Sequence, residues 1–83
     1  MDWIEEMGVR MGELRRAKGL SQGDIANELF VVPHTVSRWE RGERLITVDK
    51  LRKLAILLDT SVDYLMFGYK KEWFCANGER KDW

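Results

Sequence analysis

The chain has 83 residues, 45% of them hydrophobic and 34% charged, with one proline and one cysteine. This length allows one small globular domain and excludes a doubly wound α/β enzyme, a barrel or two independently folding modules. The 14 basic and 14 acidic residues cancel, so net charge by itself predicts no polyanionic partner, and the distribution of the charges matters more.

The first expected helix starts after Asp2, which has the spacing of a capping box with Glu5. Gly8 and Gly12 lie inside this helix, and each costs about 1 kcal/mol relative to alanine. They either allow a close backbone contact or weaken the first two turns. The second interpretation is favoured, and it moves the expected start of the helix towards Met7.

Four further short helices with tight connections are expected, because the apolar period is helical throughout and no segment alternates as a strand does. The residues that mark the helix ends are Gly19, Ser21, Pro33, Gly42, Thr47, Ser61 and Gly68. The connection of about three residues between the second and third helices fits a helix-turn-helix.

Residues 32–41 carry the clearest two-faced pattern. The apolar positions are Val32, Val36 and Trp39, and the positions with nitrogen-bearing side chains, shifted by two residues, are His34, Arg38 and Arg41. A shift of two residues is about 200° of rotation on a helix. One face is therefore expected to pack on the core, while the other projects donors that fit the major groove, where arginine matches the acceptors of guanine.

This two-faced pattern alone is equally consistent with an ordinary surface helix whose charges are solvated. The flanking residues favour DNA. Gln22 follows the Ser21 cap at a helix N-terminus, where free N–H groups favour phosphate. Arg41 and Arg44 lie at the other end of the third helix, and a duplex-binding domain needs donors at both edges of a groove.

The segments GLSQ, SRWERG and TSVDYL occur in this order along the chain. The part of the chain that contains these segments, about residues 7–67, closely resembles the Cro/phage-repressor helix-turn-helix family, also called the xenobiotic-response-element type. The resemblance implies an all-α, compact five-helix, lambda-repressor-like DNA-binding domain over residues 1–68. It implies a sequence-specific transcriptional regulator, expected to be a repressor that binds double-stranded DNA at a palindromic operator as a homodimer.

The resemblance also assigns roles to single positions. It assigns base reading to Pro33, His34, Ser37 and Arg38, and contacts with the DNA backbone to Gln22, Thr35, Arg41 and Arg44. Arg15 and Glu40 match an ion pair that braces the recognition helix. The family usually dimerises around its fifth helix, and surplus apolar residues would leave an exposed patch in a monomer. The residues expected in the dimer interface are Ile56, Tyr64, Phe67 and Trp73.

Two departures from the family pattern have structural consequences. Phe30 stands where the family usually has glycine, and phenylalanine tolerates positive φ poorly. A tighter or differently shaped turn is therefore expected. Val32 replaces a serine or threonine cap, which costs about 1 kcal/mol and is partly compensated by Pro33. Pro33 lacks a donor at the first reading position, so specificity is expected to depend more on His34 and Arg38.

The sequence gives no support for an enzyme, a cofactor or a metal site. His34 is the one histidine, Cys75 has no histidine partner at a recognisable spacing, and no glycine-rich phosphate loop is present. No run reaches about 18 apolar residues, and the N-terminus lacks an apolar signal core, so a cytoplasmic protein is expected. Arg10, Arg16 and Lys18 are expected to be solvated helix charges.

Other functions stay open. The chain fits an antitoxin whose residues 69–83 wrap a toxin partner, or a restriction–modification controller that regulates its own operon. It also fits a protein-interaction module that has lost DNA binding, although the retained Gln22, Arg38 and Arg41 argue against that. The role of residues 69–83, as a dimerisation or partner-binding tail, is not determined by the sequence.

Overall fold

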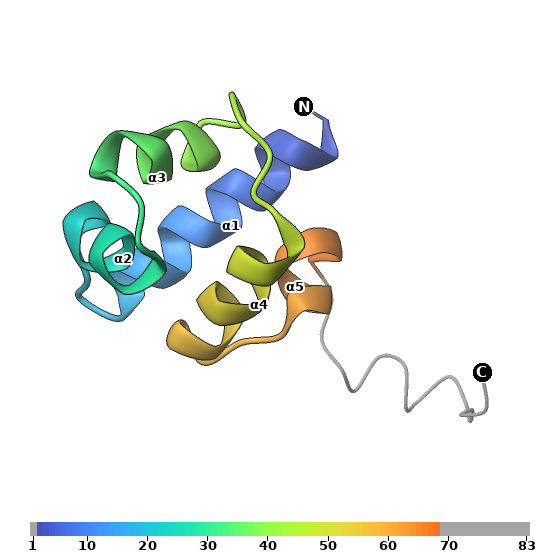
Figure 1. Ribbon diagram of the computed structural model, residues 1–83. Coiled ribbons are helices and arrows are strands. Elements are labelled where there is room, and N and C mark those ends of the chain that lie inside the picture. Colours follow the sequence, from blue (N-terminus) through green and yellow to red (C-terminus); the bar gives the residue numbers. More distant parts are fainter. Residues whose placement is uncertain (1, 69–83) are drawn as a thin grey trace.

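The computed structural model describes residues 2–68, and these form five helices without a strand. The helices are α1 (Trp3–Ala17), α2 (Gln22–Leu29), α3 (Pro33–Glu40), α4 (Val48–Leu57) and α5 (Val62–Phe67). α1 runs through the molecule, with α2 and α3 towards one side and α4 and α5 towards the other (Figure 1). The predicted all-α, five-helix fold is confirmed, and the predictions for residues 69–83 lie outside the described residues.

Short-range side-chain bonds start most of the helices. The Asp2 carboxylate accepts from the Glu5 N–H at 3.0 Å, and the Ser21 hydroxyl accepts from the Asp24 N–H at 3.0 Å. In both cases the third helical residue also accepts a bond from the N–H of the capping residue, which completes a capping box. Thr47 occupies the predicted cap of α4, but its hydroxyl donates to the Asp49 carboxylate instead of capping the backbone.

A single cluster of buried side chains holds the helices together. It consists of Met7, Met11, Ile25, Ala26, Leu29, Val36, Trp39, Ile46, Leu51, Leu54, Ala55, Leu58 and Leu65. Every helix contributes to it, so the burial of apolar surface fixes α3 against the rest of the molecule. Of the three residues predicted to form the apolar face of α3, Val36 and Trp39 are buried, whereas Val32 is 61% exposed.

The glycines of α1 mark a close contact with α3. A Cβ atom on Gly8 would lie 2.5 Å from the backbone oxygens of Trp39 and Glu40, and one on Gly12 would lie 3.3 Å from Oε1 of Glu40. α1 begins at Trp3, so the prediction that the glycines move its start towards Met7 is wrong. The alternative interpretation, close backbone packing, is the one that the structure bears out.

Phe30 forms the turn between α2 and α3 in a left-handed conformation, with φ 59° and ψ 43°. Its N–H and that of Val31 both approach the carbonyl of Ala26, as at an ordinary helix end. Phe30 thus takes the conformation that glycine would supply, and the prediction of a differently shaped turn is wrong. The ring is 83% exposed, and the Lys53 ammonium lies 5.4 Å from its centre.

Arg10 fastens the end of α5 to α1. Its Nε donates to the carbonyl of Leu65 at 2.9 Å, and its Nη2 donates to that of Met66 at 3.0 Å. The last carbonyls of a helix have no partner within the helix, and here a side chain from another helix supplies one. The prediction that Arg10 is a solvated charge is therefore wrong.

We expect Arg10→Ala to lower the free energy of unfolding by about 1–3 kcal/mol, because charge-assisted bonds to partly buried carbonyls are lost. Urea denaturation followed by circular dichroism measures this loss. Arg16→Ala is the control, since Arg16 is exposed on the same helix, and its expected change is within about 0.5 kcal/mol. Equal losses for the two variants would contradict the role given to Arg10.

Candidate nucleic-acid interface

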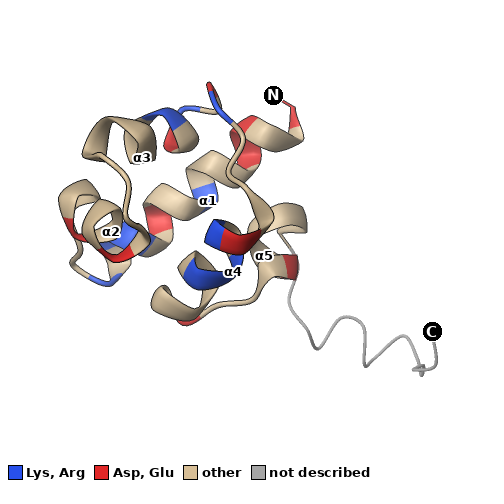
Figure 2. Cartoon of the chain, viewed as in Figure 1, with Lys and Arg blue, Asp and Glu red and all other residues tan. Residues whose placement is uncertain are grey.

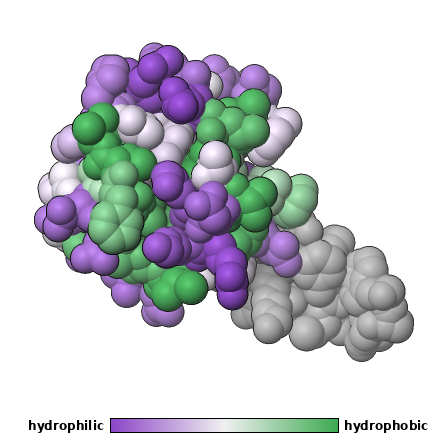
Figure 3. Space-filling view, in the orientation of Figure 1, coloured by the Kyte–Doolittle hydropathy of each residue, from purple (hydrophilic) through white to green (hydrophobic). Residues whose placement is uncertain are grey.

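One face of α3 is buried and the other faces solvent. Val36 and Trp39 pack into the core, while His34 on the opposite face is exposed. The side chains of Arg38 and Arg41 are 41% and 50% exposed. Basic residues occupy the end of α3 and the connection that follows it, next to acidic residues (Figure 2). The same edge of the molecule is mainly hydrophilic in the space-filling view (Figure 3).

A carboxylate at the end of α3 ties this helix to α1 and α2. Glu40 Oε2 accepts from Arg15 Nε at 2.7 Å, and Glu40 Oε1 accepts from Arg15 Nη2 at 3.3 Å. The two side chains are only 12% and 11% exposed, so the pair is better shielded from solvent than a surface ion pair. Arg15 Nη1 also donates to the carbonyl of Leu20 at 2.9 Å. These bonds fix the orientation of the arginine-bearing face.

Gln22 is the first residue of α2, directly after the Ser21 cap. Its Nε2 donates to Glu40 Oε1 at 3.1 Å, so this side chain belongs to the bracing network in the structure. A contact of Gln22 with a DNA phosphate stays a prediction.

Arg41 is held by two neighbours on the exposed side of α3. Its Nε and Nη2 donate to the Glu43 carboxylate at 3.0 and 3.2 Å, and its Nη1 donates to the Ser37 hydroxyl. The nearest Glu43 oxygen lies 3.9 Å from Nε of Arg38. The hydrogen bond from Arg41 lowers the pKa of Glu43, and that bond raises the pKa of Arg41.

Glu43 is the residue that the sequence analysis missed at this site. The available signal was an acidic residue directly after the glycine that ends α3, within a stretch that contains Arg38, Arg41 and Arg44.

The remaining predicted contact residues lie on α3 and in the connection that follows it. Pro33 is exposed at the first position of the helix. Thr35 and Arg44 line a shallow hollow of about 180 Å³ between α3 and the start of α4. Thr47 and Lys50 also line this hollow.

Three of the four predicted dimer residues come from α4 and α5, which pack on each other. Ile56 is 73% exposed and Phe67 is 58% exposed, while Tyr64 is partly buried. Trp73 lies outside the described residues. A dimer interface through these residues stays a prediction.

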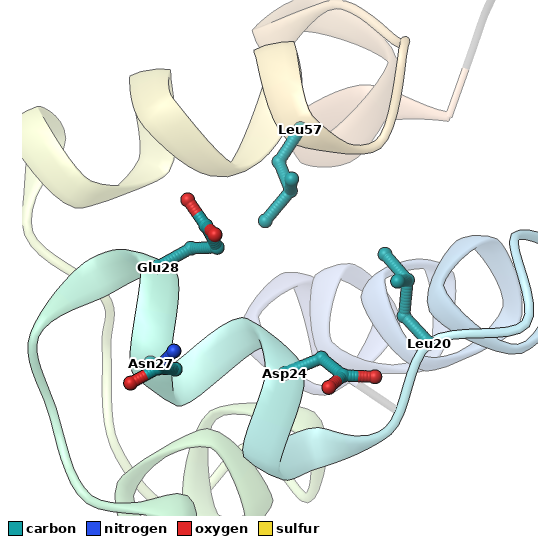
Figure 4. Close-up of a pocket in the computed structure, with 5 residues that line it drawn as sticks. All are labelled: Leu20, Asp24, Asn27, Glu28 and Leu57. Carbon is teal, nitrogen blue, oxygen red and sulfur yellow. The ribbon is translucent and has the colours of Figure 1, made fainter.

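Two adjoining hollows lie between α2 and α4, away from the arginines of α3. The first, of about 280 Å³, is lined by Leu20, Asp24, Asn27, Glu28 and Leu57 (Figure 4). The second, of about 390 Å³, is lined by Glu28, Phe30, Lys53, Ile56 and Leu57. In residues 2–68 no group of histidine, cysteine, aspartate or glutamate side chains could hold a metal ion. No helix in this part of the chain is long and apolar enough to cross a membrane.

Residues 11–65 match the family model described as helix-turn-helix. The chain therefore belongs to the helix-turn-helix family, as its resemblance to the Cro/phage-repressor type predicted.

Curated relatives are regulators. The HTH-type transcriptional regulator ImmR of Bacillus subtilis is 35% identical over 60 residues, which cover 72% of this chain and 47% of ImmR. The HTH-type transcriptional activator BcrR of Enterococcus faecalis is 27% identical over 63 residues, which cover 76% of this chain and 31% of BcrR. The chain thus spans about a third to a half of the length of these relatives.

Solved structures of similar fold include two regulators. The restriction-modification controller protein C.AhdI from Aeromonas hydrophila is 37% identical, with a TM-score of 0.69 and coverage of 75% of this chain and 94% of that one. The P22 c2 repressor, solved in complex with a synthetic operator, is 30% identical, with a TM-score of 0.72 and coverage of 76% and 96%.

The same helical unit also occurs within an enzyme. Hydroxypropylphosphonic acid epoxidase from S. wedmorenis is 26% identical, with a TM-score of 0.70, and the match covers 76% of this chain but 34% of that one. The fold alone therefore does not define an activity, and the function has to be argued from the exposed face of α3.

Proposed function

We propose that the chain acts as a sequence-specific double-stranded-DNA-binding transcriptional regulator and represses from a palindromic operator, without enzymatic activity of its own. The observation that carries this proposal is the braced, arginine-bearing face of α3 in a chain of the helix-turn-helix family. A helix held in this way fits the major groove and keeps its donors outward. A cytoplasmic location is part of the proposal.

Two kinds of contact are expected in the complex. Arg38, His34 and Ser37 read base edges from α3, next to Pro33 at its start. The backbone contacts come from Gln22, Thr35, Arg41 and Arg44. The exposed positions of His34, Arg41 and Arg44 make these side chains accessible to a duplex. Phosphate contacts would position the protein on the duplex, and base contacts would specify the sequence.

A homodimer would present two copies of α3 to successive major grooves about 34 Å apart. The expected interface residues are Ile56, Tyr64, Phe67 and Trp73. The exposure of Ile56 and Phe67 supports this, because large apolar side chains on a small domain often mark an interface. Binding of such a dimer over a promoter would block polymerase.

Selection of bound duplexes from a random library by the full chain tests the proposal. The expected result is a pool with two inverted half-sites whose centres lie about 10 base pairs apart. A pool that stays random through successive rounds would overturn the proposed function, whereas a single half-site would overturn the dimer alone.

A restriction–modification controller is the second candidate, and the likeness to C.AhdI, at 37% identity and a TM-score of 0.69, favours it. Such a role uses the same DNA-binding face. A gene for a restriction enzyme or a DNA methyltransferase next to the gene of this chain would support it, and a neighbourhood without either would overturn it.

Arg41→Ala is expected to weaken binding to every duplex by a similar factor of about 3 to 10, because a phosphate contact carries no sequence information. The slope of log affinity against log salt should become shallower by about one unit. Fluorescence anisotropy at several salt concentrations measures both quantities. A loss confined to the selected duplex would instead make Arg41 a base-reading residue.

A further inference from the structure

The end of α3 places an acidic residue against its own reading face. Gly42 takes φ 74°, its N–H donates to the Trp39 carbonyl at 3.1 Å, and the Glu43 N–H donates to the Arg38 carbonyl at 2.9 Å. This bond pattern with a left-handed glycine folds the chain back over the last turn of the helix. The backbone position of Glu43 is thus set by hydrogen bonds to the last turn of α3.

The carboxylate of Glu43 engages the two arginines that the proposed function uses. It accepts two bonds from Arg41, and one of its oxygens lies 3.9 Å from Nε of Arg38. Because the bond from Arg41 lowers the pKa of Glu43, the carboxylate is ionised at neutral pH. In the free protein, both guanidinium groups therefore face a negative charge that belongs to the same chain.

A DNA phosphate that approaches Arg41 has to displace this carboxylate. Arg41 already uses Nε and Nη2 for Glu43 and Nη1 for Ser37. If Glu43 stays in place, two like charges share one guanidinium, and if it leaves, two charge-assisted hydrogen bonds are lost. Either way the binding of phosphate is weakened, on a specific and on an unrelated duplex alike.

The displaced carboxylate has a second arginine within reach. Nε of Arg38 lies 3.9 Å away, so a small rotation of the Glu43 side chain closes this distance to a hydrogen bond. A guanidinium held at Nε keeps its two terminal nitrogens for the O6 and N7 acceptors of guanine. Where Arg38 contacts guanine, this bond also orients the guanidinium that reads the base, whereas on an unrelated sequence there is no base contact for it to orient.

We propose that Glu43 is a specificity-determining residue, which competes with DNA phosphate for Arg41 on every duplex and holds Arg38 in place when Arg38 reads its base. The proposal rests on the proposed function and assigns to it an acidic residue that acts against non-specific binding. Glu43 acts through the two arginines and is a positioning residue with respect to the DNA.

Glu43→Gln in the full chain tests the proposal, with two probes: the best duplex recovered by the wild-type selection and a scrambled duplex of the same composition. We expect the variant to bind the scrambled duplex about 3- to 10-fold more tightly, with a steeper dependence of log affinity on log salt. The selected duplex should gain less or lose affinity, so that the ratio of the two affinities falls by about threefold or more.

Glu28→Gln is the matched control. It removes the same charge from α2, where the Glu28 side chain extends towards α4 (Figure 4), and both affinities should change by the same small factor. The pair Arg41→Ala and Arg41→Ala/Glu43→Gln isolates the competition. Without Arg41, the added Glu43→Gln change should tighten binding to the scrambled duplex by a clearly smaller factor.

The outcomes separate the two proposals. If the wild-type chain binds no duplex, the proposed function fails. If it binds with selectivity but Glu43→Gln changes both affinities by an equal factor, or tightens scrambled-duplex binding by the same factor in the absence of Arg41, the role of Glu43 is overturned. Melting curves verify the fold of each variant, and Glu43→Ala serves as a second variant with the same expected loss of discrimination.

Discussion

Replacing Gly8 by alanine is expected to lower the free energy of unfolding by about 3 kcal/mol. The new Cβ atom would lie 2.5 Å from the backbone oxygens of Trp39 and Glu40. Backbone atoms at the end of α3 cannot rotate away as a side chain would, so α1 and α3 have to separate. The better helix propensity of alanine, about 1 kcal/mol, offsets only part of this cost.

Gly23→Ala is the matched control for this experiment. Gly23 also lies in a helix, but it is exposed, and the nearest atom to its added Cβ is the Ser21 hydroxyl at 3.6 Å. Here the propensity gain is unopposed, and an increase in stability of up to about 1 kcal/mol is expected. Urea denaturation of both variants should give opposite signs. A stabilising Gly8→Ala change would contradict the close contact between α1 and α3.

The features that the sequence predicted correctly act over short distances along the chain. The caps at Asp2 and Ser21 depend on a residue three positions further on, and the glycines that end helices act on their own turn. The burial of Val36 and Trp39 follows from helical periodicity. The pattern within one helix therefore sufficed to predict which side of α3 faces solvent.

The errors concern residues whose surroundings come from distant parts of the chain. Gly8 is adjacent to the backbone of Trp39, and Arg10 meets the carbonyl of Leu65, 55 positions away. Local periodicity carries no information about either contact. The sequence alone therefore predicts that Gly8 weakens the first turns of the helix and that Arg10 is a solvated charge. Phe30 shows the converse, since the turn between the packed helices α2 and α3 places it in a left-handed conformation that its own preference disfavours.

Within the candidate site, the sequence predicts which face of α3 is exposed, but it does not predict which side chains on that face pair with one another. Arg38, Arg41 and Glu43 are close in sequence, and their spacing alone does not say which of them pair. The left-handed conformation of Gly42 turns the chain back on α3 and brings the carboxylate to the arginines. The sequence predicts Gly42 as the end of the helix, but only the structure shows that this turn places Glu43 beside the arginines.

Arg38→Ala is expected to weaken binding to the selected duplex by about 10- to 100-fold and to relax the base preference at one or two positions of each half-site. The side chain is 41% exposed, and its 3.9 Å approach to Glu43 contributes little to folding. The variant should therefore melt like the wild type. A repeated library selection with the variant, beside anisotropy titrations of the selected and scrambled duplexes, measures both effects.

An equal loss of affinity for the selected and the scrambled duplex would show that Arg38 contacts phosphate. Glu43 could then not contribute to specificity through Arg38. Arg44→Ala provides the comparison, since Arg44 is exposed at the hollow beside α3 and should weaken both duplexes to a similar degree. If Arg38 reads a base with the help of Glu43, the two residues act as a unit. The double variant Arg38→Ala/Glu43→Gln should then lose no more discrimination than Arg38→Ala alone, because without the Arg38 guanidinium Glu43 has no base-reading group to hold in place.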